Sequence, residues 1–202
     1  MTELGPDWVP DADGIPHRTA ARVVLFDADG RILLISGHDA HDPDHRWWFT
    51  VGGGIEPGEE PRQAAVRELA EETGIAIDPG DLVGPVAYRR AAFHFLNVTA
   101  RQDEWFFVAH VPDEAREHAG ERHFTALEDE VLDDEQWWSP DELDAKDDGL
   151  QVYPRNLPEL ARQWRDGWDG DLLLIEELEG IGNPPEGPAA TDPAPGGPVI
   201  GD

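Results

Sequence analysis

The chain has 202 residues and a formal net charge of −29, because 44 aspartates and glutamates face 15 lysines and arginines. Binding to bulk nucleic acid requires a stripe of basic residues, and binding to a membrane surface requires a basic face, so this composition excludes both classes of protein. The chain has no cysteine, no apolar run near the ~20 residues of a membrane-spanning helix and no signal-peptide pattern, and we therefore expect a cytoplasmic protein.

The first fifty residues predict an irregular leader followed by strands. Residues 1–17 are rich in Pro, Asp and Gly and show no periodicity. The apolar runs at 20–26 and 31–36 flank an Asp-Gly turn, which favours an antiparallel hairpin. Residues 37–46 contain histidines and aspartates and predict a polar loop, and residues 47–51 predict a short strand.

The clearest helix of the chain is predicted at 61–73, directly after a glycine-rich turn at 52–54. Pro61 suits the first position of a helix, where its missing N–H group costs no hydrogen bond. Gly74 suits the left-handed residue that often follows the last turn. The sequence therefore predicts both ends of this helix.

Beyond this helix the pattern predicts strands, a long loop and two more helices. The expected strands lie at 82–88, 91–98, 104–111 and 136–138. A polar turn is expected at 101–103, and an acidic loop at 112–135. One helix begins after its N-cap residue Ser139, and the other spans 157–168, where apolar residues recur at helical spacing. Together these elements predict a single-domain mixed α/β sandwich.

Three glutamates on the predicted helix give the first chemical signal. At about 100° per residue, Glu68, Glu71 and Glu72 lie within ~100° of arc, so they share one face and repel one another. Clustered carboxylates beside a glycine turn are hard oxygen ligands, which Mg²⁺ and Mn²⁺ accept. A solvated acidic face is the other interpretation of the same residues, since the whole chain is acidic.

The segment from Gly53 to Ile75 resembles the signature of the Nudix hydrolase family, G-x5-E-x7-R-E-U-x-E-E-x-G-U, in which U is an aliphatic residue. Each defined place is filled, by Gly53, Glu59, Arg67, Glu68, Leu69, Glu71, Glu72, Gly74 and Ile75. The fixed identities would coincide by chance in about one chain in 10⁵. The resemblance implies an α/β/α sandwich with a mixed sheet over residues 18–170, including a C-terminal helix. Residues 171–202 are rich in Gly, Pro and Asp and predict a largely disordered acidic tail.

The resemblance implies a metal-dependent hydrolase with Mg²⁺ or Mn²⁺ as cofactor and a small nucleotide-type substrate. The implied reaction is cleavage of the diphosphate linkage of a nucleoside diphosphate joined to another moiety, in a nucleotide, a nucleotide sugar or a dinucleotide. Relatives often add a carboxylate from a later loop, and Glu128 is preferred here over its neighbours Asp129 and Glu130. The implied metal ligands are the Gly52 carbonyl, Glu68, Glu71, Glu72 and Glu128.

Three residues of the signature have catalytic roles by the same resemblance. Glu68 is either a metal ligand or the general base that activates water, because members of the family differ in this respect. Arg67 orients Glu68. Glu59 supports either the junction between the loop and the helix or a second metal ion.

Four residues outside the signature are predicted substrate contacts. Trp48 and Phe49 precede the glycine turn, where an aromatic ring can stack on a base, although adjacent strand residues face opposite ways and packing in the core is equally compatible with them. Arg89 and Arg90 form a rare basic pair that can contact phosphate, with a surface salt bridge as the simpler alternative. No mark downstream of the signature identifies a subgroup, so the substrate within this class stays open.

Two other functions fit the same sequence. A domain of this family that senses a nucleotide without turnover would keep the fold, but it would not need the intact set of glutamates. A cation-buffering protein would use the glutamates to bind Ca²⁺ loosely. The resemblance also implies a homodimer, since relatives commonly pair. The acidic composition alone is equally typical of adaptation to a salty cell interior.

Overall fold

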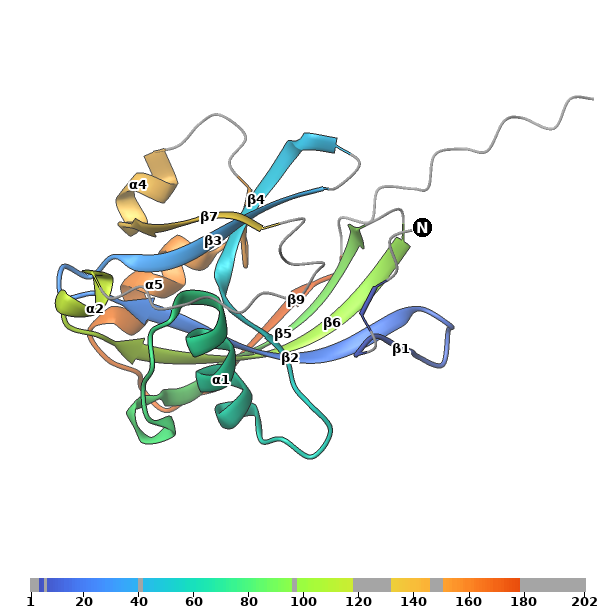
Figure 1. The fold of residues 1–202 in the computed structure, drawn as a ribbon, viewed down its shortest axis with the longest axis horizontal. Helices are drawn as coiled ribbons and strands as arrows, with labels where there is room; N and C mark the ends of the chain where they lie inside the picture. Colours follow the sequence, from blue (N-terminus) through green and yellow to red (C-terminus); the bar gives the residue numbers. More distant parts are fainter. Residues whose placement is uncertain are drawn as a thin grey trace, which may run out of the picture.

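A mixed β-sheet forms the centre of the molecule (Figure 1). The computed structural model describes residues 4–5, 7–39, 42–95, 98–117, 132–145 and 151–178. The strands are β1 (Val9–Pro10), β2 (Pro16–Phe26), β3 (Ile32–Asp39), β4 (Asp42–Gly54), β5 (Val83–Phe95), β6 (Val98–His110), β7 (Leu132–Trp138), β8 (Gln151–Tyr153) and β9 (Leu173–Glu177). The helices are α1 (Pro61–Thr73), α2 (Glu114–Glu117), α4 (Pro140–Ala145) and α5 (Leu157–Arg165), with a 3₁₀ turn at Pro79–Asp81.

The strands follow the order β7-β3-β4-β2-β6-β5-β9, with β1 added to β2 and β8 added to β4. The pairs β2–β6, β4–β8 and β5–β9 are parallel, and the other pairs are antiparallel. In the middle of the sheet, Ala21 of β2 pairs with Gly53 on one side and with Trp105 on the other. The predicted mixed sheet of an α/β domain is confirmed.

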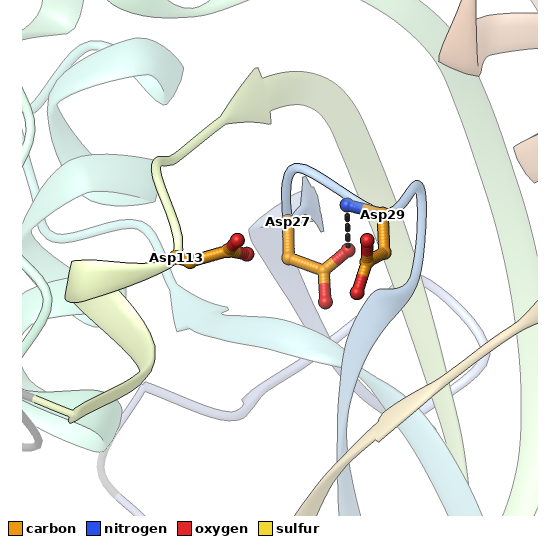
Figure 2. Close-up of side chains that lie close together, drawn as sticks. All are labelled: Asp27, Asp29 and Asp113. Atoms are coloured by element: carbon orange, nitrogen blue, oxygen red, sulfur yellow. Dashed lines mark hydrogen bonds between the residues drawn. The ribbon is translucent and has the colours of Figure 1, made fainter.

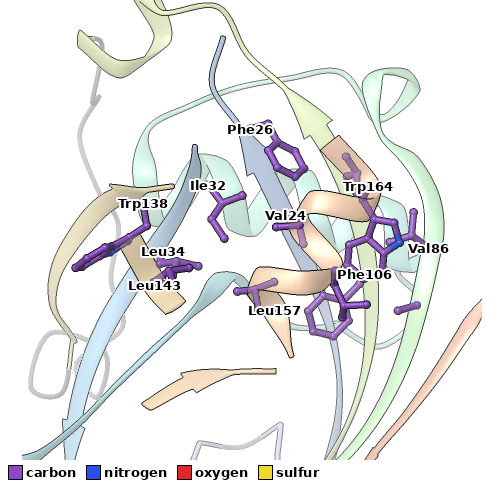
Figure 3. Close-up of a cluster of buried hydrophobic side chains, with 14 of the residues drawn as sticks. Val24, Phe26, Ile32, Leu34, Val86, Phe106, Trp138, Leu143, Leu157 and Trp164 are labelled. Carbon is purple, nitrogen blue, oxygen red and sulfur yellow. The ribbon is translucent and has the colours of Figure 1, made fainter. Parts of the chain in front are cut away.

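Helices cover both faces of the sheet, because its central strands are apolar on both faces. Val23 and Leu25 of β2 belong to the cluster under α1, whereas Val24 and Phe26 belong to the cluster under α5 (Figure 3). Burial of each large apolar side chain contributes roughly 1.5–3 kcal/mol. The apolar residues of α5 that recur at helical spacing all lie in the cluster under α5, namely Leu157, Leu160, Ala161 and Trp164. The α/β/α sandwich is therefore confirmed.

Helix α1 begins at Pro61 and ends at Thr73, as the sequence predicts. Gly74 follows in the left-handed conformation with φ 73°, and its N–H group donates to the Ala70 carbonyl at 2.9 Å. Ala65 and Leu69 are fully buried and hold the helix on the sheet. Among the described residues, no helix is both long and apolar enough to cross a membrane.

The strands around the predicted loop at 37–46 reach further than expected. Most of that segment belongs to β3 and β4, where Gly37 pairs with Trp47 and His38 pairs with Arg46. Backbone pairing does not require apolar side chains, so a polar segment can extend the ladder. The acidic loop predicted at 112–135 likewise contains α2 and the start of β7.

The predicted turn at 101–103 is wrong, because these residues lie inside β6. The segments predicted as two strands before it belong largely to the single strand β5. Polar side chains here have polar or charged partners, since Arg101 lies 2.6 Å from Asp11 and Asp103 lies 3.2 Å from His17. These partners come from the leader and from β2, and a local sequence pattern cannot reveal them.

Strands at both ends lie outside the predicted domain limits of 18–170. β1 pairs with β2 in the predicted leader, and Trp8 packs edge-on against Phe93 with 5.9 Å between ring centroids. β9 lies within the segment predicted as a largely disordered tail, and it pairs with β5. Burial of Ile175, which is 8% exposed, gives this strand an apolar anchor. The final helix also ends earlier than predicted, at Arg165.

Candidate active site

The glycines 52–54, predicted as a turn after a short strand, are instead the last residues of β4 and pair with β2. This segment, called the glycine turn below, brings the strand backbone against α1. Gly52 has φ +135°, which residues other than glycine rarely adopt, and a Cβ there would lie 2.1 Å from the Ala21 carbonyl oxygen. A Cβ on Gly53 would lie 2.5 Å from Glu68 Oε2. The Gly52 N–H group donates to Glu72 Oε2 at 2.8 Å. The bare turn therefore lets two carboxylates of α1 approach the backbone of β4.

Two of the three clustered glutamates are buried. Glu68 is 8% exposed and Glu72 is 4% exposed, whereas the side chain of Glu71 is 42% exposed. Burial of a carboxylate is unfavourable unless hydrogen-bond donors or a cation compensate for the lost water. A solvated acidic face would leave all three side chains in water, so this interpretation does not fit Glu68 and Glu72.

Arg67 holds carboxylates from the loop and the helix together. It donates to Glu59 Oε1 at 3.0 Å and Oε2 at 2.9 Å, to Glu68 Oε1 at 2.7 Å and to Glu71 Oε2 at 3.0 Å. The Gly54 carbonyl oxygen accepts a further hydrogen bond at 2.9 Å. The hydrogen bonds between Arg67 and Glu59 lower the pKa of Glu59 and raise the pKa of Arg67, so both groups are charged at neutral pH. The three residues predicted to be catalytic therefore lie together.

The atoms around the glycine turn that could bind a metal ion are all oxygens. The Gly52 N–H group binds the carboxylate of Glu72, the carbonyl of the same residue accepts from Arg22, and Glu68 packs against Gly53. Carboxylate and carbonyl oxygens suit Mg²⁺ and Mn²⁺, so the chemistry of this set fits the predicted ion. The predicted later-loop ligand Glu128 and its alternatives, Asp129 and Glu130, lie outside the described residues.

A separate acidic group lies at the β2–β3 turn (Figure 2). Oxygens of Asp27, Asp29 and Asp113 come within 4.8 Å of one another, and no other metal-type group in the described part of the chain is as tight. Asp27 Oδ1 accepts the N–H groups of Asp29 at 3.0 Å and Arg31 at 2.8 Å, as is usual in a hairpin turn. At ~3.3 Å per residue, Asp27 lies ~20 Å along β2 from Ala21, which pairs with the glycine turn. This aspartate group is therefore separate from the glutamates of α1.

A buried ionic network adjoins the glycine turn. Arg22 of β2 donates to the Gly52 carbonyl and, at 3.2 Å, to the Thr50 carbonyl. It also donates to Glu104 Oε1 on β6 at 2.9 Å, and Glu104 accepts a second hydrogen bond from Arg89. Neither Arg22 nor Glu104 stands in a motif, so the sequence alone gives no sign of this contact. Only the parallel pairing of β2 with β6 brings them together.

The two arginines predicted as substrate contacts both have carboxylate partners. Arg89 is 8% exposed, and besides Glu104 it binds Glu177 of β9, with 2.9 Å between Nε and Oε2. Arg90 is largely exposed and lies 3.6 Å from Glu176. Arg90 also lines a cavity of about 370 Å³ between the leader, β5 and β6. The structure thus places the first arginine in the buried network and the second at the surface.

The two aromatic residues before the turn lie in different packing environments. Trp48 packs edge-on against Trp138, with 5.2 Å between ring centroids, in the cluster under α5. Phe49 packs against the cluster under α1, and the guanidinium carbon of Arg22 lies 5.3 Å from its ring centroid. Phe49 is therefore the nearer of the two to the residues that hold the glycine turn.

Known proteins match the part of the chain that carries this site. The NUDIX domain family matches residues 16–160. The RNA pyrophosphohydrolase of Dinoroseobacter shibae is 43% identical over 68 residues, which cover 34% of this chain and 41% of that protein. Diphosphoinositol polyphosphate phosphohydrolase 3-alpha of Homo sapiens is 34% identical over 100 residues, which cover 47% of this chain and 58% of that protein. The chain thus spans about half the length of these curated relatives.

Two solved structures share the fold. A MutT protein from Methanosarcina mazei Go1 superposes with a TM-score of 0.51 and 19% identity, covering 74% of this chain and 95% of that one. A mutator MutT protein from Bacillus halodurans gives 0.50 and 17%, covering 80% and 91%. At such identities the likeness shows the fold alone. Since the family match covers more than half of the chain and includes the complete signature from Gly53 to Ile75, the chain belongs to the Nudix family.

Proposed function

We propose that this protein is a metal-dependent pyrophosphohydrolase that cleaves the diphosphate linkage of a nucleoside diphosphate joined to another moiety. The burial of Glu68 and Glu72 beside the glycine turn carries this conclusion, because two buried carboxylates on one helix face repel each other and a divalent ion between them would offset that repulsion in addition to the hydrogen bonds from Arg67 and Gly52. Relatives named RNA pyrophosphohydrolase and diphosphoinositol polyphosphate phosphohydrolase support hydrolysis of a phosphate anhydride. The nucleoside part of the substrate rests on the resemblance of the signature.

Hydrolysis adds water across one P–O–P bridge, so that the water oxygen bonds to phosphorus and the bridging oxygen leaves with the other phosphate. Mg²⁺ or Mn²⁺, held by the Gly52 carbonyl, Glu68, Glu71 and Glu72, would neutralise the diphosphate and lower the pKa of the attacking water. Glu68 is either one of these ligands or the base that accepts the proton of the water. Arg67 fixes the orientation of Glu68 in both cases, through the 2.7 Å hydrogen bond to Oε1.

Glu59 supports this arrangement from the loop. Both of its oxygens accept hydrogen bonds from Arg67, which favours a role at the junction between the loop and the helix over a role as ligand of a second ion. The net charge of the chain, −29, repels an anionic diphosphate. Cations bound at the glycine turn are therefore the most direct means by which this protein can hold its substrate.

The remaining predicted contacts stay predictions. Arg89 and Arg90 would each have to release their carboxylate partners in order to bind phosphate. Trp48 would have to leave its packing with Trp138. Phe49 packs against the cluster under α1 and beside Arg22, and its contact with a substrate is likewise a prediction. A carboxylate from residues 128–130, a homodimer and a cytoplasmic location likewise stay predictions.

The test is a panel of nucleoside triphosphates, dinucleotides and nucleotide sugars, incubated with the protein and Mg²⁺ or Mn²⁺ and assayed for phosphate and nucleoside monophosphate. We expect turnover of at least one class by the wild type. Because each supplies a buried carboxylate at the turn, Glu68→Gln and Glu72→Gln should each lower kcat by about 100-fold or more. Circular dichroism should show that both variants stay folded.

Glu159→Gln is the matched control, because it makes the same change at an exposed position on α5. Its kcat should equal that of the wild type. The enzyme assignment fails if the wild type is inert across the panel or if Glu72→Gln hydrolyses normally. Nucleotide binding without turnover would instead support a sensing module.

A further inference from the structure

Glu104 lies on a strand that the signature does not include, yet its contacts lead to the candidate metal site. We propose that Glu104 is a positioning residue for that site, which acts by holding Arg22 against the Gly52 carbonyl. This inference rests on the proposed function, because it concerns the affinity of the same glycine turn for a divalent ion. It also assigns a part in that site to β9, through Arg89 and Glu177.

Arg22 spans three neighbouring strands. Its Nε group donates to Glu104 of β6 at 2.9 Å, while Nη1 donates to the carbonyls of Thr50 and Gly52 of β4. Arg22 itself belongs to β2, which lies between these strands, and it is 8% exposed. The planar guanidinium group has several donors in a fixed geometry, so fixing one side by Glu104 also fixes the donors on the other side.

Gly52 is held at both of its backbone polar groups. Its N–H group donates to Glu72 at 2.8 Å, and its carbonyl accepts from Arg22. A carbonyl oxygen has two lone pairs, so a hydrogen bond from Arg22 leaves a second direction for a cation. The contact with Arg22 therefore orients a proposed ligand without using up its capacity as a ligand.

Charge gives Glu104 a second effect on the same site. An unneutralised guanidinium group next to the Gly52 carbonyl would repel a divalent ion, because the attraction and repulsion of charges are strong where water is excluded. Glu104 is 2% exposed and bonds directly to Arg22, so it offsets that charge locally. Loss of the carboxylate would both free Arg22 to move and leave its charge beside the cation.

Glu104 is shared by two arginines, and this is where β9 enters. Arg89 also donates to Glu104, and Glu177 of β9 accepts from Arg89 with 2.9 Å between Nε and Oε2. The Glu177 carboxylate also accepts the N–H group of Arg155 at 2.7 Å, which fixes its place. Without Glu177, Arg89 would have Glu104 as its remaining carboxylate partner among these residues and would compete with Arg22 for it.

The experiment compares Glu104→Gln, Glu177→Gln and the control Glu176→Gln in the full-length chain. Glu176 is the neighbour of Glu177 in β9, but its side chain is 67% exposed and it lies 3.6 Å from the surface residue Arg90. Binding of Mn²⁺ in the absence of substrate is measured by electron paramagnetic resonance or calorimetry. Groups that orient metal ligands typically change metal affinity by 10–100-fold, so we expect Glu104→Gln to raise the Kd for Mn²⁺ by about 10-fold or more.

The other two variants should change the Kd for Mn²⁺ less than Glu104→Gln does. Glu177→Gln acts through Arg89 and should raise the Kd by about 3-fold, less than the 10–100-fold range of direct orienting groups. Glu176→Gln should leave the Kd unchanged. In the hydrolysis assay, the Mg²⁺ concentration for half-maximal rate should rise in the same order, while KM for the substrate at saturating Mg²⁺ stays near the wild-type value.

The outcomes separate this inference from the proposed function. If the wild type binds Mn²⁺ and hydrolyses a substrate, while folded Glu104→Gln and Glu177→Gln bind Mn²⁺ as the wild type does, the positioning role is wrong and the enzyme assignment stands. If the wild type neither binds Mn²⁺ nor hydrolyses any substrate, both are wrong. Should Glu104→Gln lose its cooperative unfolding transition, Glu177→Gln at the edge of the sheet decides, and an unchanged Kd there overturns the role.

Discussion

Gly52 is constrained from three directions. Its N–H group binds Glu72, its carbonyl accepts from Arg22, and a Cβ would lie 2.1 Å from the Ala21 carbonyl oxygen. Its φ of +135° adds strain for any other residue. We therefore expect Gly52→Ala to destabilise the protein by at least ~1–3 kcal/mol, the usual cost of a strained backbone conformation, and to weaken Mn²⁺ binding because the turn must move away from β2.

Gly58→Ala tests the strain of a positive φ without the steric clash that a Cβ at position 52 would cause. Gly58 also has a positive φ, +85°, but a Cβ there would meet no atom within 4 Å. Its substitution should therefore cost only ~1–2 kcal/mol and leave Mn²⁺ binding intact. Urea unfolding and Mn²⁺ titration of both variants check this pair, and equal unfolding midpoints for the two would contradict the importance of the Ala21 contact.

At the scale of elements, α5 provides stability rather than chemistry. Leu160 is 3% exposed and lies in the cluster with Val24 and Phe26, on the face of the sheet opposite to α1. Leu160→Ala leaves a cavity in this cluster and should lower the free energy of unfolding by ~2–5 kcal/mol. Because the glycine turn packs on the other side, folded Leu160→Ala should bind Mn²⁺ with wild-type affinity.

Gln163→Ala is the control on the same helix, since Gln163 is exposed. Its effect should stay within ~0.5 kcal/mol, as is usual at the surface. Urea unfolding measures both variants. A wild-type midpoint for Leu160→Ala would show that α5 is not packed on the sheet as described.

The elements also show which parts of a fold a sequence can predict. The ends of α1 were predictable because Pro61 and Gly74 act on their own helix. The ends of β3 to β6 were not, since a strand ends where its neighbour ends, and polar segments such as 101–103 find partners on β2 or in the leader. β9 was missed for the same reason, because it pairs with β5 and contacts such as that between Arg89 and Glu177 join residues far apart in the sequence.

Across the whole molecule, the contacts of the candidate site also divide into those that local sequence reveals and those that only the structure reveals. The contact of Arg67 with Glu71 follows from their i, i+4 spacing on one helix, and Glu68 stands next to Arg67 in the signature, so local sequence reveals both partners. The contact between Arg22 and Glu104 joins residues 82 positions apart, and no local pattern reports it. A motif thus identifies the side chains that face the reaction, whereas the structure is needed to find those that hold them.

For the molecule as a whole, acid has two opposing effects on stability. Exposed carboxylates take up protons near pH ~4, which reduces the net charge of −29 and relieves self-repulsion. Buried carboxylates that bind arginines act in the other direction. Burial alone would raise the pKa of Glu104, but Arg89 and Arg22 outweigh this effect and lower it to about 2 from an ordinary value of 4.5. Arg67 lowers the pKa of Glu59 in the same sense.

We expect the unfolding temperature to rise slightly as the pH falls from about 7 to about 5, and then to fall steeply. A carboxylate whose pKa is lowered in the fold binds protons on unfolding, so its contribution is present above pH 4.5 and is lost as the pH falls toward 2. Glu104→Gln removes this titration. Its unfolding temperature should therefore be lower at neutral pH but less steeply dependent on pH below 4.5. Calorimetry of both proteins checks this, and parallel curves in the acid range would show that Glu104 is not the ionised centre of the buried network.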